Sequence, residues 1–144
     1  MSRLIYRERV LPGPGTLLLP LVIGFLLYAT LLPLDSSAAL CLSAGLVVAA
    51  EGLLVFRAPV IEVSDKVLRV GRANIERKFL GKVSIIDPEE SFSERGHKLD
   101  ARAYTCFQGS VRTMVKLELN DLNDPCPYWL FSTRQAESLV SLLG

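Results

Sequence analysis

Two long apolar runs near the N-terminus constrain this chain more than any other feature. Residues 10–34 hold no charged side chain over 25 positions, and residues 36–56 are interrupted only by Glu51. One acid, Asp35, separates the two runs. The hydrocarbon core of a bilayer is roughly 30 Å thick and takes about 20 apolar residues of helix. The sequence therefore predicts an integral membrane protein with an N-terminal helical hairpin and a polar domain behind it.

The residues that flank the runs set the expected helix boundaries. Pro and Gly at positions 12–15 disfavour helix, so we expect an N-terminal segment 1–15 and a first helix at 16–34, with Thr16 as its N-cap. Asp35 then caps a second helix at 37–56, within a hairpin segment 16–57. A cleaved signal peptide is the alternative, but its apolar region usually spans only about 7–15 residues. We therefore predict two antiparallel transmembrane helices.

The distribution of basic residues predicts the orientation of the hairpin. Arg3, Arg7 and Arg9 precede it and Arg57 follows it, while the connecting loop carries only Asp35. Arg and Lys concentrate on the cytoplasmic side of membrane proteins. We therefore expect a multi-pass protein of the cell membrane with both termini in the cytoplasm, and a cytosolic domain at 58–144.

Small residues follow one stripe of the second predicted helix. Cys41, Gly45 and Ala49 are spaced four apart, a spacing that lets helix backbones approach closely in lipid. Two interpretations stay open. The stripe packs against the first helix of the same chain, or it docks another membrane protein through a face that includes Gly45.

The single acid of the second run is the other candidate contact in the hairpin. Glu51 lies six residues before Arg57, or roughly 9 Å deep by helical rise. Carboxylates inside a membrane are costly and are often functional. Either Glu51 meets Arg57, Arg9 or lipid headgroups near the interface, or it contacts a partner helix or a proton-linked site.

Short alternating segments replace the helical pattern after residue 58. Strands are expected at 60–64, 67–70, 74–79, 82–87, 102–107, 111–119 and 128–132. The polar stretch 88–98 suits a loop or a short helix, and Ala136, Leu139, Val140 and Leu143 form one apolar face of a C-terminal helix. Seven strands followed by a C-terminal helix are typical of a PH-like barrel. The expected fold class is thus membrane α+β, a two-helix transmembrane hairpin followed by a small β-rich, PH-like barrel or sheet domain with a C-terminal helix.

Composition and motifs argue against several classes of function. The 58–144 segment carries twelve basic and twelve acidic residues, without the basic stripe of a nucleic-acid module. Cysteine and histidine spacings do not fit a zinc site, and phosphate-loop, dinucleotide, zincin and nucleophile-elbow motifs do not occur. His97 and Asp100 with a nearby Ser or Cys106 make only a forced triad. We expect no nucleic-acid partner, cofactor, metal or catalytic site.

The best remaining ligand candidate is the start of the last helix. Ser132, Thr133 and Arg134 precede that helix, whose free amides and dipole favour an anion, and Arg134 offers a guanidinium to a phosphate. The alternative is structural. In that case residues 132–135 form a capping box while the aromatic side chains of 128–131 fill the core.

Several segments resemble the domain of unknown function 3093 family. The resemblance rests on Tyr6-Arg7-Glu8-Arg9, on Leu99-Asp100 with Ala103-Tyr104, and above all on the segment 124–134, which reads DPCPYWLFSTR. The chain departs from the family pattern at Cys126, where Thr is usual, at Gln135, where Pro often stands, and in a leucine-rich first span. The resemblance implies an actinobacterial two-span membrane protein with a small cytosolic domain. It supplies no activity.

These observations favour a non-enzymatic, membrane-anchored binding or scaffolding module. Its expected contacts are the lipid bilayer and either a membrane-protein partner or anionic lipid headgroups. The alternative is an accessory subunit that docks a larger membrane complex through its hairpin. A membrane-bound hydrolase using His97 or Cys106 is the third hypothesis.

Overall fold

The computed structural model describes residues 2–144, which form two compact units. One unit is the helical segment Leu11–Ala58. The other combines residues 2–10 with Pro59–Gly144. The N-terminal residues therefore belong to the same unit as the C-terminal two thirds of the chain, and the helical segment is an insertion in it.

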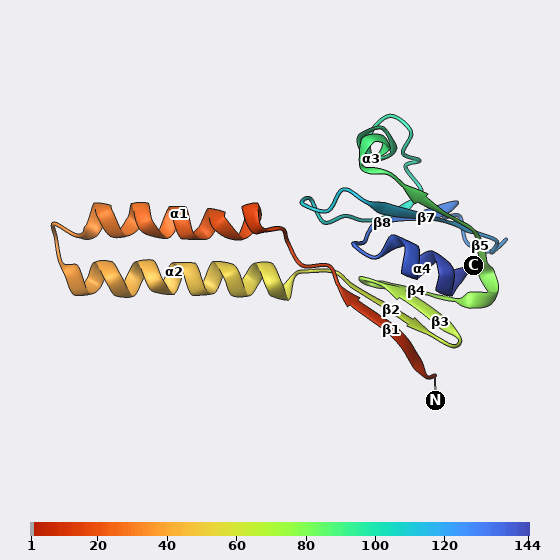
Figure 1. Cartoon of the computed structure of the whole chain (residues 1–144), viewed down its shortest axis with the longest axis horizontal. Coiled ribbons are helices and arrows are strands. Elements are labelled where there is room, and N and C mark those ends of the chain that lie inside the picture. The colour runs from red at the N-terminus through yellow and green to blue at the C-terminus, as the bar shows by residue number, and fades with distance from the viewer. Residues whose placement is uncertain (1) are drawn as a thin grey trace. The chain divides into compact units, whose positions relative to one another are not determined.

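Two antiparallel helices, α1 (Pro14–Leu31) and α2 (Ser36–Phe56), make up the helical unit (Figure 1). Pro14 begins α1 because the first position of a helix needs no amide donor, so the N-cap is Gly13 and the N-cap predicted at Thr16 is wrong. The helix ends at Leu31, because Pro33 has no amide to continue the hydrogen-bond ladder two residues later. The Asp35 carboxylate accepts hydrogen bonds from the amides of Ser37 (2.8 Å) and Ala38 (3.1 Å), so its predicted capping role is confirmed.

Both helices are long and apolar enough to span a membrane. Only 11% of the residues in their most apolar windows are buried. Large apolar side chains therefore cover the outside of the pair on all sides.

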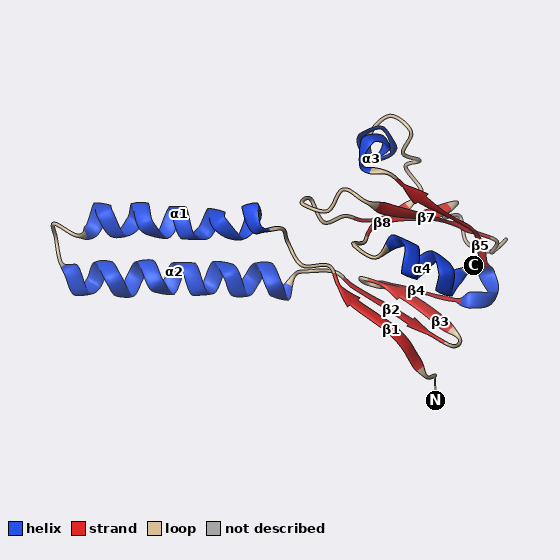
Figure 2. Cartoon of the chain, viewed as in Figure 1, coloured by secondary structure: helices blue, strands red, loops and turns tan. Residues whose placement is uncertain are grey.

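The first sheet of the other unit has the strand order β1-β2-β3-β4 (Figure 2). Its strands are β1 (Leu4–Arg9), β2 (Val60–Ser64), β3 (Val67–Val70) and β4 (Ala73–Glu76), all paired antiparallel. No strand was predicted before residue 58, and β1 shows that this prediction is wrong. The amide of Val10 donates to the oxygen of Pro59 at 2.9 Å, which continues the β1–β2 ladder. Residues 11–58 therefore leave this sheet and return to it at neighbouring positions.

The second sheet has the order β5-β7-β8-β6. Its strands are β5 (Leu80–Ile86), β6 (Tyr104–Cys106), β7 (Met114–Leu119) and β8 (Tyr128–Ser132). A 3₁₀ turn, η1 (Arg77–Phe79), precedes β5, and the helix α3 (Pro88–Arg95) follows it. The strand predicted at 74–79 thus ends at Glu76, and those predicted at 102–107 and 111–119 are shorter. β6 runs parallel to β8, a pairing that alternation of residue types does not predict.

One core joins the two sheets and the C-terminal helix α4 (Ala136–Leu143). In Figure 2, α4 lies between the sheets, and its buried residues Ala136, Leu139 and Leu143 belong to the same cluster as strand residues of both sheets. β8 is buried on both faces. Trp129 and Phe131 belong to this main core. Tyr128 and Leu130 belong to a smaller cluster, against which Leu99, Ala103 and Phe107 pack. The chain is therefore an α+β protein, and the predicted apolar face of its last helix is confirmed.

Candidate functional site

Small residues bring the two helices of the hairpin together. A side chain at Gly24 would overlap that of Val47, so the helices approach closely at this point. Ala39 and Ser43 are buried on the same face of α2. The Ser43 hydroxyl donates to the Ala39 oxygen at 2.7 Å, which satisfies a polar group in apolar surroundings. The face of α2 toward α1 is therefore defined by Ala39, Ser43 and Val47.

The predicted small-residue stripe lies on a different face. Cys41, Gly45 and Ala49 are exposed, and a Cβ atom added at Gly45 would have no neighbouring heavy atom within 4 Å. The interpretation that this stripe packs against the first helix of its own chain is wrong. Docking of another membrane protein at Gly45 stays a prediction.

Glu51 is half-buried in the hairpin. Arg57 is the one basic residue of Leu11–Ala58, yet among residues 2–144 the structure contains no Glu51–Arg57 ion pair within 4.0 Å. The predicted pairing of Glu51 with Arg57 is therefore absent, and its contact with Arg9, with lipid headgroups or with a partner helix stays a prediction.

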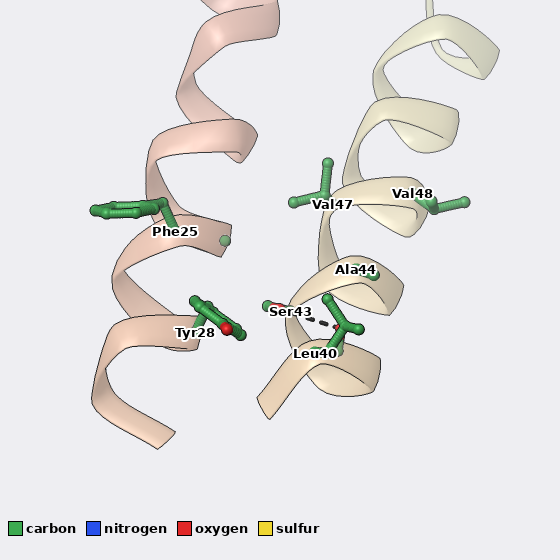
Figure 3. Close-up of a pocket in the computed structure, with 8 residues that line it drawn as sticks. Phe25, Tyr28, Leu40, Ser43, Ala44, Val47 and Val48 are labelled. Carbon is green, nitrogen blue, oxygen red and sulfur yellow. Dashed lines mark hydrogen bonds between the residues drawn. The ribbon is translucent and has the colours of Figure 1, made fainter. Parts of the chain in front are cut away.

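A hollow of about 390 Å³ lies along the hairpin (Figure 3). Its lining is almost wholly apolar: Gly24, Phe25, Tyr28, Leu40, Ser43, Ala44, Val47 and Val48. In Figure 3 the ring of Tyr28 points toward α2, whereas the ring of Phe25 points away from it. The Ser43 hydroxyl is hydrogen-bonded to the backbone of its own helix. This surface therefore suits contact with an acyl chain or an apolar side chain rather than a catalytic reaction.

A half-buried carboxylate network forms a polar site of the β-rich unit. Glu8, on β1, accepts hydrogen bonds from the Thr133 hydroxyl (2.5 Å), the Arg134 amide (3.0 Å) and the Tyr6 hydroxyl (3.0 Å). Thr133 is fully buried, and its hydroxyl oxygen also accepts from the Gln135 amide at 3.2 Å. Glu8 thus joins the strand before the hairpin to the residues that precede α4.

This network changes the interpretation of the predicted anion site at 132–134. The anion that meets Thr133 and the Arg134 amide in this structure is the chain's own Glu8 carboxylate. Ser132 lies apart, at the end of β8, where its hydroxyl accepts from the Gln108 amide at 3.0 Å. An external anion at these groups would have to displace Glu8.

The predicted capping box of the last helix is wrong. α4 begins at Ala136, and its N-cap Gln135 makes no side-chain capping bond. The Ser132 and Thr133 hydroxyls are engaged elsewhere, by Gln108 and Glu8. Tertiary partners therefore displaced the local capping interaction that the spacing of Ser132 and Gln135 predicts.

Tyr6 has the most perturbed hydroxyl of this network. Burial raises the pKa of its phenol, and the hydrogen bond to Glu8 and the charge of that carboxylate raise it further. Tyr6 therefore stays protonated and acts as a donor over the whole physiological range. The sequence did not identify Glu8 as part of a site, because its partners Thr133 and Arg134 lie more than a hundred residues away.

The residues of the forced triad do not assemble. The Ser91 and Ser93 hydroxyls donate to the oxygens of Pro88 (2.8 Å) and Glu90 (2.9 Å), within their own helix. Asp100 pairs with Arg102. Burial raises the pKa of the Cys106 thiol, the opposite of what an activated nucleophile needs. Within residues 2–144, no group of three or more His, Cys, Asp or Glu side chains is placed to hold a metal ion.

Comparisons with known proteins agree with the family resemblance. Neither the curated proteins nor the solved structures include a match to this chain. The family described as "Protein of unknown function (DUF3093)" matches residues 5–143, which covers the hairpin and both sheets. The chain belongs to the DUF3093 family.

Proposed function

We propose that this protein is a membrane-anchored binding or scaffolding module without enzymatic activity. The observation that carries the proposal is the exposed apolar surface of α1 and α2. Phe25, for example, is 68% exposed, and only 11% of the residues in each helix's apolar window are buried. A core helix of a water-soluble protein would be covered by its own chain. A helix that is apolar all round and uncovered suits a lipid environment.

The β1–β2 pairing supports the proposed orientation. Both ends of the hairpin join one sheet, so the N-terminal strand and the C-terminal unit share a compartment. Arg7 and Arg9 precede the hairpin and Arg57 follows it, whereas its tip carries Asp35. This asymmetry favours the cytoplasm for both termini and the cell membrane for the hairpin.

The arrangement of the β-rich unit supports a PH-like domain as the binding part. Its support is a four-stranded antiparallel meander, a second sheet and a C-terminal helix in the core. β1 is the strand beyond the seven predicted ones, and β6 and α3 lie in the connection from β5 to β7.

Fractionation and topology reporters test the membrane part of the proposal. We expect the full chain to stay in the membrane pellet after an alkaline carbonate wash and to keep residues 2–10 in its intact mass. A periplasm-dependent reporter should be active after Asp35 and inactive after Gly144. A soluble full-length product, or a product trimmed within the hairpin, would contradict the proposal.

Co-purification tests the binding part. Extraction in a mild detergent, followed by mass spectrometry, should recover a companion protein or anionic lipid with the full chain. A strictly monomeric chain that carries neither would count against a binding role.

A second candidate function is an accessory subunit that docks through the hairpin. Two observations favour it: the stripe Cys41, Gly45 and Ala49 faces away from α1, and Glu51 has no ion-pair partner in the hairpin. Close helix contact in lipid depends on small residues, so a bulky side chain on this stripe would separate the backbones.

Matched substitutions separate the two functions. Gly45→Leu and Glu51→Leu should abolish assembly with a partner, while Val48→Leu, an exposed position outside the stripe, should leave it intact. Trp129 fluorescence reports whether the β-rich unit stays folded. Unchanged assembly in both Gly45→Leu and Glu51→Leu would remove the accessory-subunit function.

A further inference from the structure

A polar pocket of about 320 Å³ lies between α3 and the connection from β6 to β7. It is lined by Pro88, Ser91, Phe92, Arg95, Gly109 and Arg112. Two arginines and no acid take part in this lining. Its volume is in the range of small-ligand sites in proteins, roughly 300–1,000 Å³.

Arg95 is held in a defined orientation. Its Nη2 donates to the Val111 oxygen at 2.8 Å, and its Nε approaches the sulfur of Met114 at 3.3 Å. The guanidinium also lies over the Phe107 ring, 4.9 Å from the centroid. A guanidinium carries five N–H donors, so these two contacts leave others available to a ligand.

Arg112 places a second positive charge at the same pocket. It is exposed, and among residues 2–144 its side chain has no hydrogen bond or ion pair. Burial lowers the pKa of Arg95, and the positive charge of Arg112 lowers it further, because the two cations repel each other. An anion between the two guanidiniums would relieve this repulsion.

The acids of α3 do not neutralise the pocket. Glu94 is buried elsewhere on the helix, where it meets Lys116 (3.4 Å) and Lys98 (3.8 Å). Glu89 and Glu90 are exposed and do not line the pocket. α3 therefore separates its charges, with its acids away from the pocket and Arg95 in it.

We propose that this pocket binds the phosphate group of a phosphorylated ligand between Arg95 and Arg112. Paired guanidiniums match the charge and the planar hydrogen-bonding geometry that a phosphate monoester requires. Phe92, 86% exposed beside the pocket, offers an apolar contact to the rest of the ligand. This site goes beyond the membrane-anchored function and requires only the folded β-rich unit.

Titration of inorganic phosphate and of glycerol phosphate into the full chain, in a neutral detergent, tests the site. Calorimetry should detect binding that weakens at least about tenfold in Arg112→Gln, because a charge-assisted hydrogen bond and a cation are lost together. Arg72→Gln is the matched control, since it removes the same charge from the exposed turn between β3 and β4, outside the pocket. Arg95→Gln should also abolish binding, and Trp129 fluorescence verifies its fold.

Nanodiscs distinguish a lipid source of the phosphate from a soluble one. Thermal stabilisation by phosphatidic acid, relative to phosphatidylcholine alone, that disappears in Arg112→Gln identifies a lipid headgroup. Binding of the soluble phosphates with no such stabilisation identifies a soluble ligand. No Arg112-dependent effect in either experiment, or an equal loss in Arg72→Gln, would overturn the proposal. Fractionation of the same variants tests the membrane anchor separately.

Discussion

The hairpin exposes its large apolar side chains, whereas the β-rich unit mostly buries them. Phe25 of α1 is 68% exposed, whereas Phe131 of β8 is fully buried. α4 is apolar on one face, and that face enters the core between the sheets, whereas α1 and α2 are apolar all round. The helix pair thus needs only a narrow seam of small residues for its own contact, and the β-rich unit needs an interlocking core.

The exposed apolar area of each region indicates the solvent in which that region is stable. In water, exposed apolar surface is unfavourable by roughly 25 cal/mol per Å² relative to buried surface. The β-rich unit removes that surface through its fold. The hairpin leaves it exposed, as the proposed lipid environment would allow.

Removal of the hairpin should have the largest effect. Replacing residues 11–58 with Asn-Gly joins Val10 to Pro59 through a turn that suits adjacent antiparallel strands. We expect the shortened protein to move completely from the membrane to the soluble fraction, with buried Trp129 fluorescence retained. An insoluble product, or one with fully exposed Trp129, would show that the β-rich unit depends on the hairpin.

Two phenylalanine substitutions sharpen the comparison. Phe131→Ala should lower the free energy of unfolding by about 3–5 kcal/mol, because it leaves a cavity in the core. Phe25→Ala removes the same atoms from an exposed site and should change that free energy by less than about 0.5 kcal/mol. Denaturant unfolding of the full chain in detergent, followed by Trp129 fluorescence, measures both. Equal effects at the two sites would break the distinction.

Loss of the Glu8 carboxylate should have an intermediate effect. Glu8→Ala leaves the buried Thr133 hydroxyl and the Arg134 amide without their acceptor, at an expected cost of about 1–3 kcal/mol. Glu118→Ala, an exposed acid on β7, is the matched control. Similar unfolding midpoints for the two variants would show that Glu8 does not hold β1 to the segment before α4.

Alkaline pH should reveal the smallest effect, through Tyr6. Because the folded state raises the pKa of this phenol above its ordinary value near 10, its contribution to stability is fully present below that pH. It is lost progressively as the pH rises further, since the unfolded chain releases the proton first. Tyr6→Phe should therefore reduce the fall in stability above about pH 10. An identical pH dependence in the variant would contradict the assigned cause.

Local patterns predicted the elements that their own residues define. The apolar runs predicted both long helices, and alternation predicted β2 and β3 with their bounds. β8 was recognisable as a short apolar run, and the spacing of Ala136, Leu139 and Leu143 predicted the buried face of α4. Each of these signals lies within one element, so no distant partner was needed to interpret it.

The elements that were missed depend on partners far along the chain. In β1, Tyr6 and Glu8 alternate with Arg7 and Arg9 as in a strand, but the pairing strand β2 follows only after the whole hairpin. The arginines were therefore not interpreted as strand residues. The pocket at Arg95 and Arg112 was missed for the same reason, since the two residues lie on different elements.

Residue order alone predicted the helix pair and the α+β character of the chain, because the hydrophobic effect acts on each run of residues wherever it stands. Three features were known only from the folded structure. β1 forms the edge of the first sheet, the Gly45 stripe faces away from α1, and Glu8 accepts a hydrogen bond from Thr133. These outcomes depend on strand register and on which helix face is buried. Both are set by contacts between residues that are distant in sequence.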